Sequence, residues 1–254
     1  MTVNATRAPI LSTANTFPDT CRMFVKEQFK NVAKLVNYAV AWTSIAKPDL
    51  SQNVVRFGGM AKDCKNFIGA SELPGKLEKM AGAVKSFAQN PSTHTFRGAL
   101  RDTSFAMNSF FDGTELFTKY FPIAKERFEL IQNVNYVATT CGSLNGTVEE
   151  LENLSTNAAK TRPELARLYV INLAKNVSYL ALGVMGVLGA FFGFKTVGWM
   201  MLASVTSGLL FTIGGYFYEK IVDPEKRHQN KDAIIINLRV ENMGLRAGQS
   251  APAA

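Results

Sequence analysis

Two long stretches without charge lie side by side near the C-terminal end and constrain what this chain of 254 residues can fold into. Residues 177–194 are 18 positions without a charged side chain, residues 196–218 are 23 more, and Lys195 separates them. A helix needs about 20 apolar residues to cross the hydrocarbon core of a bilayer. The two stretches therefore predict a helical membrane hairpin with a tight turn around Lys195, which puts both outer ends on one side of the membrane.

The charges around the hairpin predict its orientation. Arg167 and Lys175 precede it, and Lys220 and Lys226 follow it, so the positive-inside rule places both termini in the cytosol. A channel or transporter is disfavoured because Lys195 is the only ionisable residue between the two stretches. The alternative to a membrane hairpin is a buried hairpin at the centre of a soluble bundle, but two uncharged stretches of this length exceed what a core helix needs.

Glycine recurs along the first stretch at spacings of three and four. Small residues at this spacing let helices approach closely in lipid, where no water competes for the backbone. The predicted helix-packing residues, which would also serve self-association, are Gly183, Gly186, Gly189 and Gly193.

Three basic amphipathic helices are predicted before the hairpin, with breaks at Pro48 and Pro74. Apolar residues recur every three or four positions within 25–40, 57–67 and 77–87, and basic residues are interleaved with them. Lysines on such helices hold anionic headgroups while the apolar face enters the membrane. The alternative is a soluble bundle with solvated lysines. The predicted lipid-binding residues are Lys26, Lys30, Lys34, Lys76, Lys79 and Lys85.

Two further helices are predicted from an aromatic face between Phe96 and Phe121 and an apolar repeat between Phe128 and Leu154. We expect them to pack lengthwise with these apolar faces turned toward each other. The predicted fold class is all-α. The expected organisation is a disordered tail (1–22), an amphipathic helical bundle (23–156), a membrane-entry helix with the hairpin (163–219) and a polar cytosolic tail (220–254).

The sequence offers little for catalysis. His94 and His228 lie far apart, and no serine or cysteine is accompanied by a recognisable base motif. The three cysteines stand alone, without zinc-ligand spacing. We therefore expect no catalytic residues, no metal, no cofactor and no enzymatic activity. Nucleic acid is not an expected partner, because the basic stripes lack interleaved exposed aromatic residues.

Over about residues 24–219 the chain resembles the peroxin eleven family of peroxisome-proliferation membrane proteins. The resemblance rests on residues 29–38, 65–69, 101–106 with Asp112, and 172–176. It implies insertion of an amphipathic helix into the cytosolic leaflet, membrane curvature and elongation, self-association, and a peroxisomal location.

A second resemblance covers less of the chain. Two closely spaced apolar lobes with a tight turn are similar to the bilobed domain of chlamydial inclusion membrane proteins. That resemblance implies a bacterial protein anchored in an inclusion membrane of a host cell, whose helical region recruits a cytosolic partner. The favoured prediction is a non-enzymatic integral membrane protein that shapes or elongates an organelle membrane, with anionic lipids and further copies of itself as partners.

Overall fold

The computed structural model describes residues 16–121, 125–195 and 198–222. All regular structure in these residues is helical, which confirms the all-α fold class. The helices are α1 (Phe17–Glu27), α2 (Phe29–Ala46), α3 (Gln52–Gln89), α4 (Thr93–Phe117), α5 (Lys125–Ser155), α6 (Asn157–Thr161), α7 (Pro163–Phe192) and α8 (Gly198–Val222).

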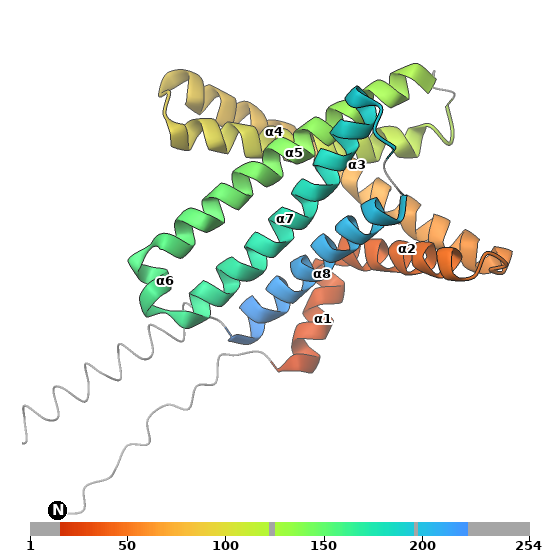
Figure 1. The fold of residues 1–254 in the computed structure, drawn as a ribbon, viewed down its shortest axis with the longest axis horizontal. Helices are drawn as coiled ribbons and strands as arrows, with labels where there is room; N and C mark the ends of the chain where they lie inside the picture. The colour runs from red at the N-terminus through yellow and green to blue at the C-terminus, as the bar shows by residue number, and fades with distance from the viewer. Residues whose placement is uncertain (1–15, 122–124, 196–197, 223–254) are drawn as a thin grey trace, which may run out of the picture.

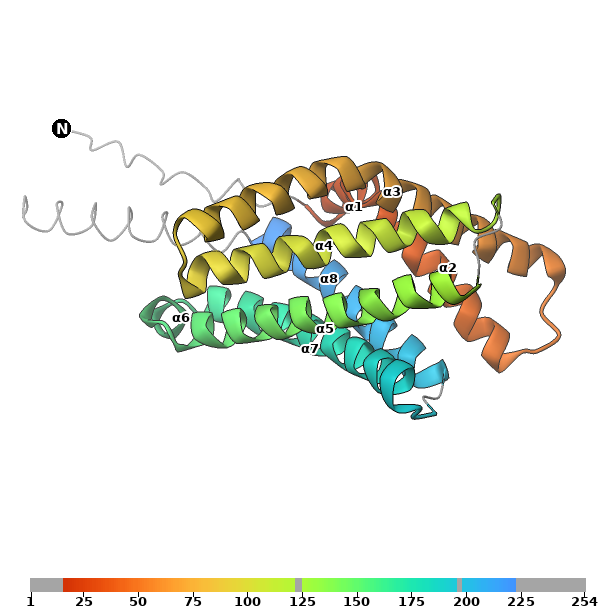
Figure 2. The same cartoon turned by 90° about the horizontal axis from the view of Figure 1, so that it is seen from above.

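The long helices form two sets that cross each other (Figure 1). α3 and α4 lie side by side, and they cross the set made by α5, α7 and α8. Seen from above, α3, α4, α5 and α7 follow one another as successive layers (Figure 2). Because α7 packs along α5 and α8 packs on α2, the hairpin is an integral part of the bundle and not an appended anchor.

Local sequence signals set several helix ends. At the start of α4 the Ser92 hydroxyl accepts a hydrogen bond from the Thr95 amide while Thr95 caps the Ser92 amide, so two otherwise unpaired donors are satisfied. α7 begins at Pro163, whose fixed φ suits the first turn of a helix. It ends at Gly193, which has a φ of +68° and donates its N–H to the carbonyl of Leu188. Glycine adopts this left-handed conformation without a Cβ penalty.

The helices on either side of Pro74 are one continuous helix, so the predicted break there is wrong. Proline removes one helical hydrogen bond and crowds the preceding turn. Contacts with α4 hold α3 in place before and after Pro74, since Asn66 donates to Glu115 at 2.9 Å and Lys76 donates to Ser109 at 2.8 Å.

Two predicted segments differ in extent from the structure or lie outside it. α1 begins at Phe17, inside the predicted N-terminal tail, and ends at Glu27, so the first predicted helix is divided between α1 and α2 at Gln28. Residues 1–15, and nearly all of the predicted C-terminal tail, lie outside the described residues.

α4 and α5 pack against each other as predicted, but the predicted inward direction of their apolar faces is wrong for many residues. On α4 and in the turn that follows it, five of the predicted inward aromatic residues are exposed: Phe96, Phe110, Phe117, Tyr120 and Phe121. On α5, three members of the predicted repeat are exposed, namely Val134, Leu144 and Leu151, whereas Phe128 stacks against Phe111 of α4 with ring centroids 5.9 Å apart. The inward face of α5 is polar or small instead, because Asn145 donates to the Arg97 carbonyl and Gly142 lies against Ser104.

The same inversion runs through most of the bundle. Among the buried side chains of the described residues, eight are polar or charged and seven are apolar, and four of those seven are alanine. Large hydrophobic side chains are exposed on every described helix except α6. A soluble protein buries its large apolar side chains and solvates its polar ones. Polar residues turned inward and apolar residues turned outward are typical of helices packed in lipid.

Two of the described helices, α7 and α8, are long and apolar enough to cross a membrane, each with a mean hydropathy of 1.4 in its most apolar stretch. Only 11% of that stretch in α7 and 17% in α8 is buried within the bundle. The core helix of a soluble protein would be mostly buried, so the low burial argues against the soluble-core alternative.

Candidate functional site

A cavity of about 680 Å³ lies inside the crossing of the two helix sets. It is lined by α2, α3, α4, α5, α7 and α8, and this volume is within the range of about 300–1,000 Å³ that binds small organic molecules. Six cationic side chains line it, from four of these helices: Lys30, Lys34, Lys65, Lys76, Arg101 and Lys175.

Asp112 of α4 connects two of these lysines on one side of the cavity. Its carboxylate lies 3.1 Å from Lys30 Nζ and 2.9 Å from Lys65 Nζ. The side chains of Asp112 and Lys65 are both 13% exposed, so the pair is shielded from water. Gly69 makes this approach possible, because a Cβ there would overlap the Asp112 carboxylate.

Glu72 of α3 binds two of the lysines as well. Its carboxylate lies 3.1 Å from Lys30 Nζ and 2.8 Å from Lys76 Nζ. Burial by itself would raise the pKa of Glu72, but the hydrogen bond from Lys76 and the charge of Lys30 outweigh it and lower that pKa. Glu72 is therefore held in its charged form.

Lys34 lines the same cavity one helical turn after Lys30 but forms no ion pair within the described part of the chain. Burial of its ammonium group and repulsion from Lys30 lower its pKa to about 8, and attraction to Asp112 only partly opposes them. An ammonium group removed from water without a counter-ion is costly. Lys34 is thus the least compensated charge in this cluster.

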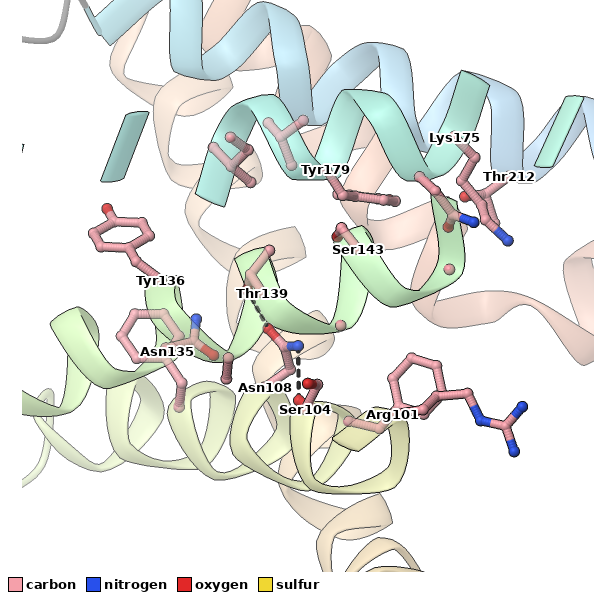
Figure 3. A pocket seen from close by; sticks show the side chains of 18 of the residues that line it. Arg101, Ser104, Asn108, Asn135, Tyr136, Thr139, Ser143, Lys175, Tyr179 and Thr212 are labelled. Atoms are coloured by element: carbon pink, nitrogen blue, oxygen red, sulfur yellow. Dashed lines mark hydrogen bonds between the residues drawn. The ribbon is translucent and has the colours of Figure 1, made fainter. Parts of the chain in front are cut away.

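The cavity lining also carries neutral hydrogen-bonding groups, shown in Figure 3. Asn108 of α4 donates to the Ser104 carbonyl at 2.9 Å and accepts from the Thr139 hydroxyl of α5 at 3.2 Å. Asn135 of α5 also lines the cavity, and its buried side-chain oxygen has no hydrogen-bond partner among the described residues. Buried polar atoms are nearly always paired, so this oxygen is free to accept from a ligand or a water molecule.

The six predicted lipid-binding lysines separate into two groups. Lys30, Lys34 and Lys76 come together in the cavity. The other three, Lys26, Lys79 and Lys85, are exposed, the first on α1 and the last two on α3.

The four predicted helix-packing glycines also have different surroundings. Gly183 and Gly186 are buried where α7 crosses α5, and a Cβ at Gly183 would lie 2.8 Å from the Thr140 backbone nitrogen. Gly193 caps α7 and has open space where a Cβ would lie, and Gly189 is partly exposed on α7. The close approach at Gly183 and Gly186 is therefore within one chain.

The carboxylates that complete the cluster were not predicted from the sequence pattern. Asp112 entered only through a family resemblance, and neither Glu72 nor Glu115 was singled out. A signal was present, because Ser104, Asn108 and Asp112 recur every four residues along α4. That polar stripe faces the cavity while the aromatic residues Phe96, Phe110 and Phe117 of the same helix are exposed.

Comparisons of the chain with family models, curated proteins and solved structures gave no match.

Proposed function

We propose that the protein is a non-enzymatic integral membrane protein that shapes or elongates an organelle membrane. The observation that carries the proposal is the inverted bundle, in which large apolar side chains face outward on seven of the described helices. Among these, only α7 and α8 have the length and composition of spanning helices. The exposed surfaces of α2 to α5 carry many large apolar residues, and charged residues interrupt these helices, so we place them at the interface and in one leaflet.

This arrangement supports an uneven insertion of protein volume across the bilayer. The hairpin occupies both leaflets, while exposed residues such as Phe57, Met60 and Phe67 on α3 add apolar volume to one. Unequal insertion bends a membrane toward the leaflet that receives less volume. Apolar contact supplies most of the binding energy in this proposal, and the exposed lysines Lys79 and Lys85 add attraction to anionic headgroups.

Self-association belongs to the proposal, since it concentrates inserted helices. Gly183 and Gly186 are occupied by α5 of the same chain, so contacts between copies would use other surfaces. The apolar stripe on α5 offers the spacing of a helix-packing seam, and its exposed members are Leu130, Val134, Val137, Leu144 and Leu151.

Reconstitution into liposomes tests the proposal. Full-length protein added to large anionic liposomes should elongate them into tubules visible by electron microscopy. A variant with Phe57→Ser, Met60→Ser and Phe67→Ser should stay anchored by the hairpin but leave the vesicles round. Lys79→Gln with Lys85→Gln is the matched charge control and should reduce tubulation only at low salt. Wild-type protein that inserts and leaves vesicles spherical contradicts the proposal.

The alternative is a membrane-anchored protein whose helical region recruits a cytosolic partner, and it makes a different prediction for the same variants. If the outer face of α3 recruits a cytosolic protein, wild-type protein alone leaves liposomes round, and the triple serine variant loses the partner. Deleting the hairpin is a poor test, because α7 packs along α5 and is part of the folded bundle.

For location, we propose the peroxisomal membrane with both termini cytosolic, which the resemblance to the peroxin eleven family supports. A fluorescently tagged copy that marks peroxisomes is the expected result. Accumulation on a bacterial inclusion membrane would instead support the inclusion-membrane alternative.

A further inference from the structure

The lysines of the cavity outnumber the carboxylates that they contact. The cavity is lined by six cationic side chains (Lys30, Lys34, Lys65, Lys76, Arg101 and Lys175) and three carboxylates (Asp112, Glu149 and Glu150), and a fourth carboxylate, Glu72, pairs with Lys30 and Lys76. The cluster thus has an excess of two positive charges, which matches the charge of a phosphate monoester near neutral pH.

The excess is directed into the cavity. Lys30, Lys34 and Lys76 all line it, and the first two lie one turn apart on α2. Lys76 donates to Ser109 and Glu72, while Lys34 has no carboxylate within ion-pairing distance in the described residues. Lysine ammonium groups bind phosphate oxygens as compact charges with several donors.

The remaining cavity surface fits an organic group attached to the phosphate. Asn135 offers an unpaired amide oxygen that can accept from a ligand hydroxyl. Phe105, Phe111 and Leu182 supply apolar contact in the same cavity. The volume of about 680 Å³ is larger than a single phosphate ion needs.

We propose that this cavity is a binding site for an organic phosphate, with the phosphate held by Lys30, Lys34 and Lys76 and a hydroxyl-bearing portion directed toward Asn135. The same chemistry occurs in a soluble phosphate ester and in the headgroup of a phospholipid. The site lies in the bundle interior, so the inference stands whether or not the protein shapes membranes.

Two probes distinguish the two sources. The first is sn-glycerol 3-phosphate, titrated calorimetrically into full-length protein in a neutral detergent, with glycerol as the phosphate-free control. The second is phosphatidic acid in nanodiscs, compared with nanodiscs of phosphatidylcholine alone, with bound lipid detected by native mass spectrometry after transfer to detergent.

Lys34→Met is the decisive variant, and Lys85→Met is its control on the exposed surface of α3. Lys34 has no ion pair to lose within the described residues, so its replacement is not expected to unfold the protein, and a melting curve checks this. Saturable binding of sn-glycerol 3-phosphate that weakens at least tenfold in Lys34→Met and is unchanged in Lys85→Met supports a soluble ligand.

A phospholipid headgroup is supported if the wild-type protein retains phosphatidic acid selectively and does not bind the soluble probe. Lys34→Met should then lose this retention, and Lys85→Met should keep it. The proposal is overturned if neither probe binds the folded wild-type protein. It is equally overturned if Lys34→Met and Lys85→Met weaken binding to the same extent, because the attraction would then come from surface charge.

Discussion

Replacing Lys34 with methionine should stabilise the protein at neutral pH. Burial and the neighbouring Lys30 lower the Lys34 pKa from its ordinary value of 10.5 to about 8. A tenfold change in proton affinity corresponds to about 1.4 kcal/mol, so the charged side chain reduces the free energy of unfolding by roughly 3 kcal/mol. Methionine has a similar length and no charge, and removes this cost. For a protein of this size, the gain corresponds to an increase of about 6–12 °C in melting temperature at pH 7.

The gain should depend on pH with a defined sign. Below pH 8 Lys34 is charged in both the folded and the unfolded chain, and its full cost is present. Between pH 8 and 10.5 the folded chain loses this proton while the unfolded chain keeps it, so the wild-type protein gains stability as pH rises. The difference between wild type and Lys34→Met should therefore be largest at pH 7 and small at pH 10.

Thermal unfolding in a neutral detergent, followed by tryptophan fluorescence, measures this difference. Trp42 is a suitable reporter, because its indole N–H donates to Thr206 of α8 at 3.0 Å and so links α2 to the hairpin. Each variant is compared with wild type at the same pH, so that the effect of pH on the rest of the protein is common to both. Lys85→Met should stay within about 0.5 kcal/mol of wild type at both pH values. A lower melting temperature for Lys34→Met, or a difference independent of pH, would refute the reasoning.

Three further substitutions test other parts of the structure. Asp112→Asn should lower the free energy of unfolding by about 1–3 kcal/mol, because it removes one of the two carboxylates that Lys30 and Lys65 each contact and leaves them with Glu72 and Glu115; an unchanged melting temperature would show that the pairs are solvated. Gly183→Ala should cost about 1–3 kcal/mol in the same assay by forcing α7 away from α5, whereas Gly214→Ala, with open space around it, should not destabilise the hairpin; equal effects would argue against the α5–α7 contact. Leu144→Arg should destabilise protein in nanodiscs by about 2–3 kcal/mol if α5 faces hydrocarbon, and an effect below about 0.5 kcal/mol would indicate water there.

The sequence predicted the helices more reliably than the direction of their faces. α7 and α8 are evident from local composition, because a stretch without charge and long enough to span a bilayer needs no knowledge of its neighbours. Which face of α5 turns inward depends on whether water or lipid surrounds the bundle. Treating Val134 and Leu144 as core residues assumes water outside, and the structure reverses that assignment.

The site was harder to predict than the fold because its residues are far apart in the sequence. Lys30 and Asp112 come together only because α2 and α4 both pack against α3 and the small residue Gly69 leaves room for the carboxylate. The spacing of Lys26, Lys30 and Lys34 predicted a single basic stripe. The helix is interrupted at Gln28, so that Lys26 is exposed on α1 while the other two lie on α2 and line the cavity.

The outward direction of the apolar faces, and their contact with lipid, is tested most directly by a spin label on α5. A label introduced by Leu144→Cys, in a variant without the three native cysteines, reports its collisions with oxygen, which concentrates in hydrocarbon, and with a water-soluble nickel chelate. In reconstituted protein the account predicts that oxygen dominates at position 144, while nickel dominates for a label introduced by Lys85→Cys on the exposed surface of α3. Nickel accessibility at position 144 equal to that at position 85 would contradict the account.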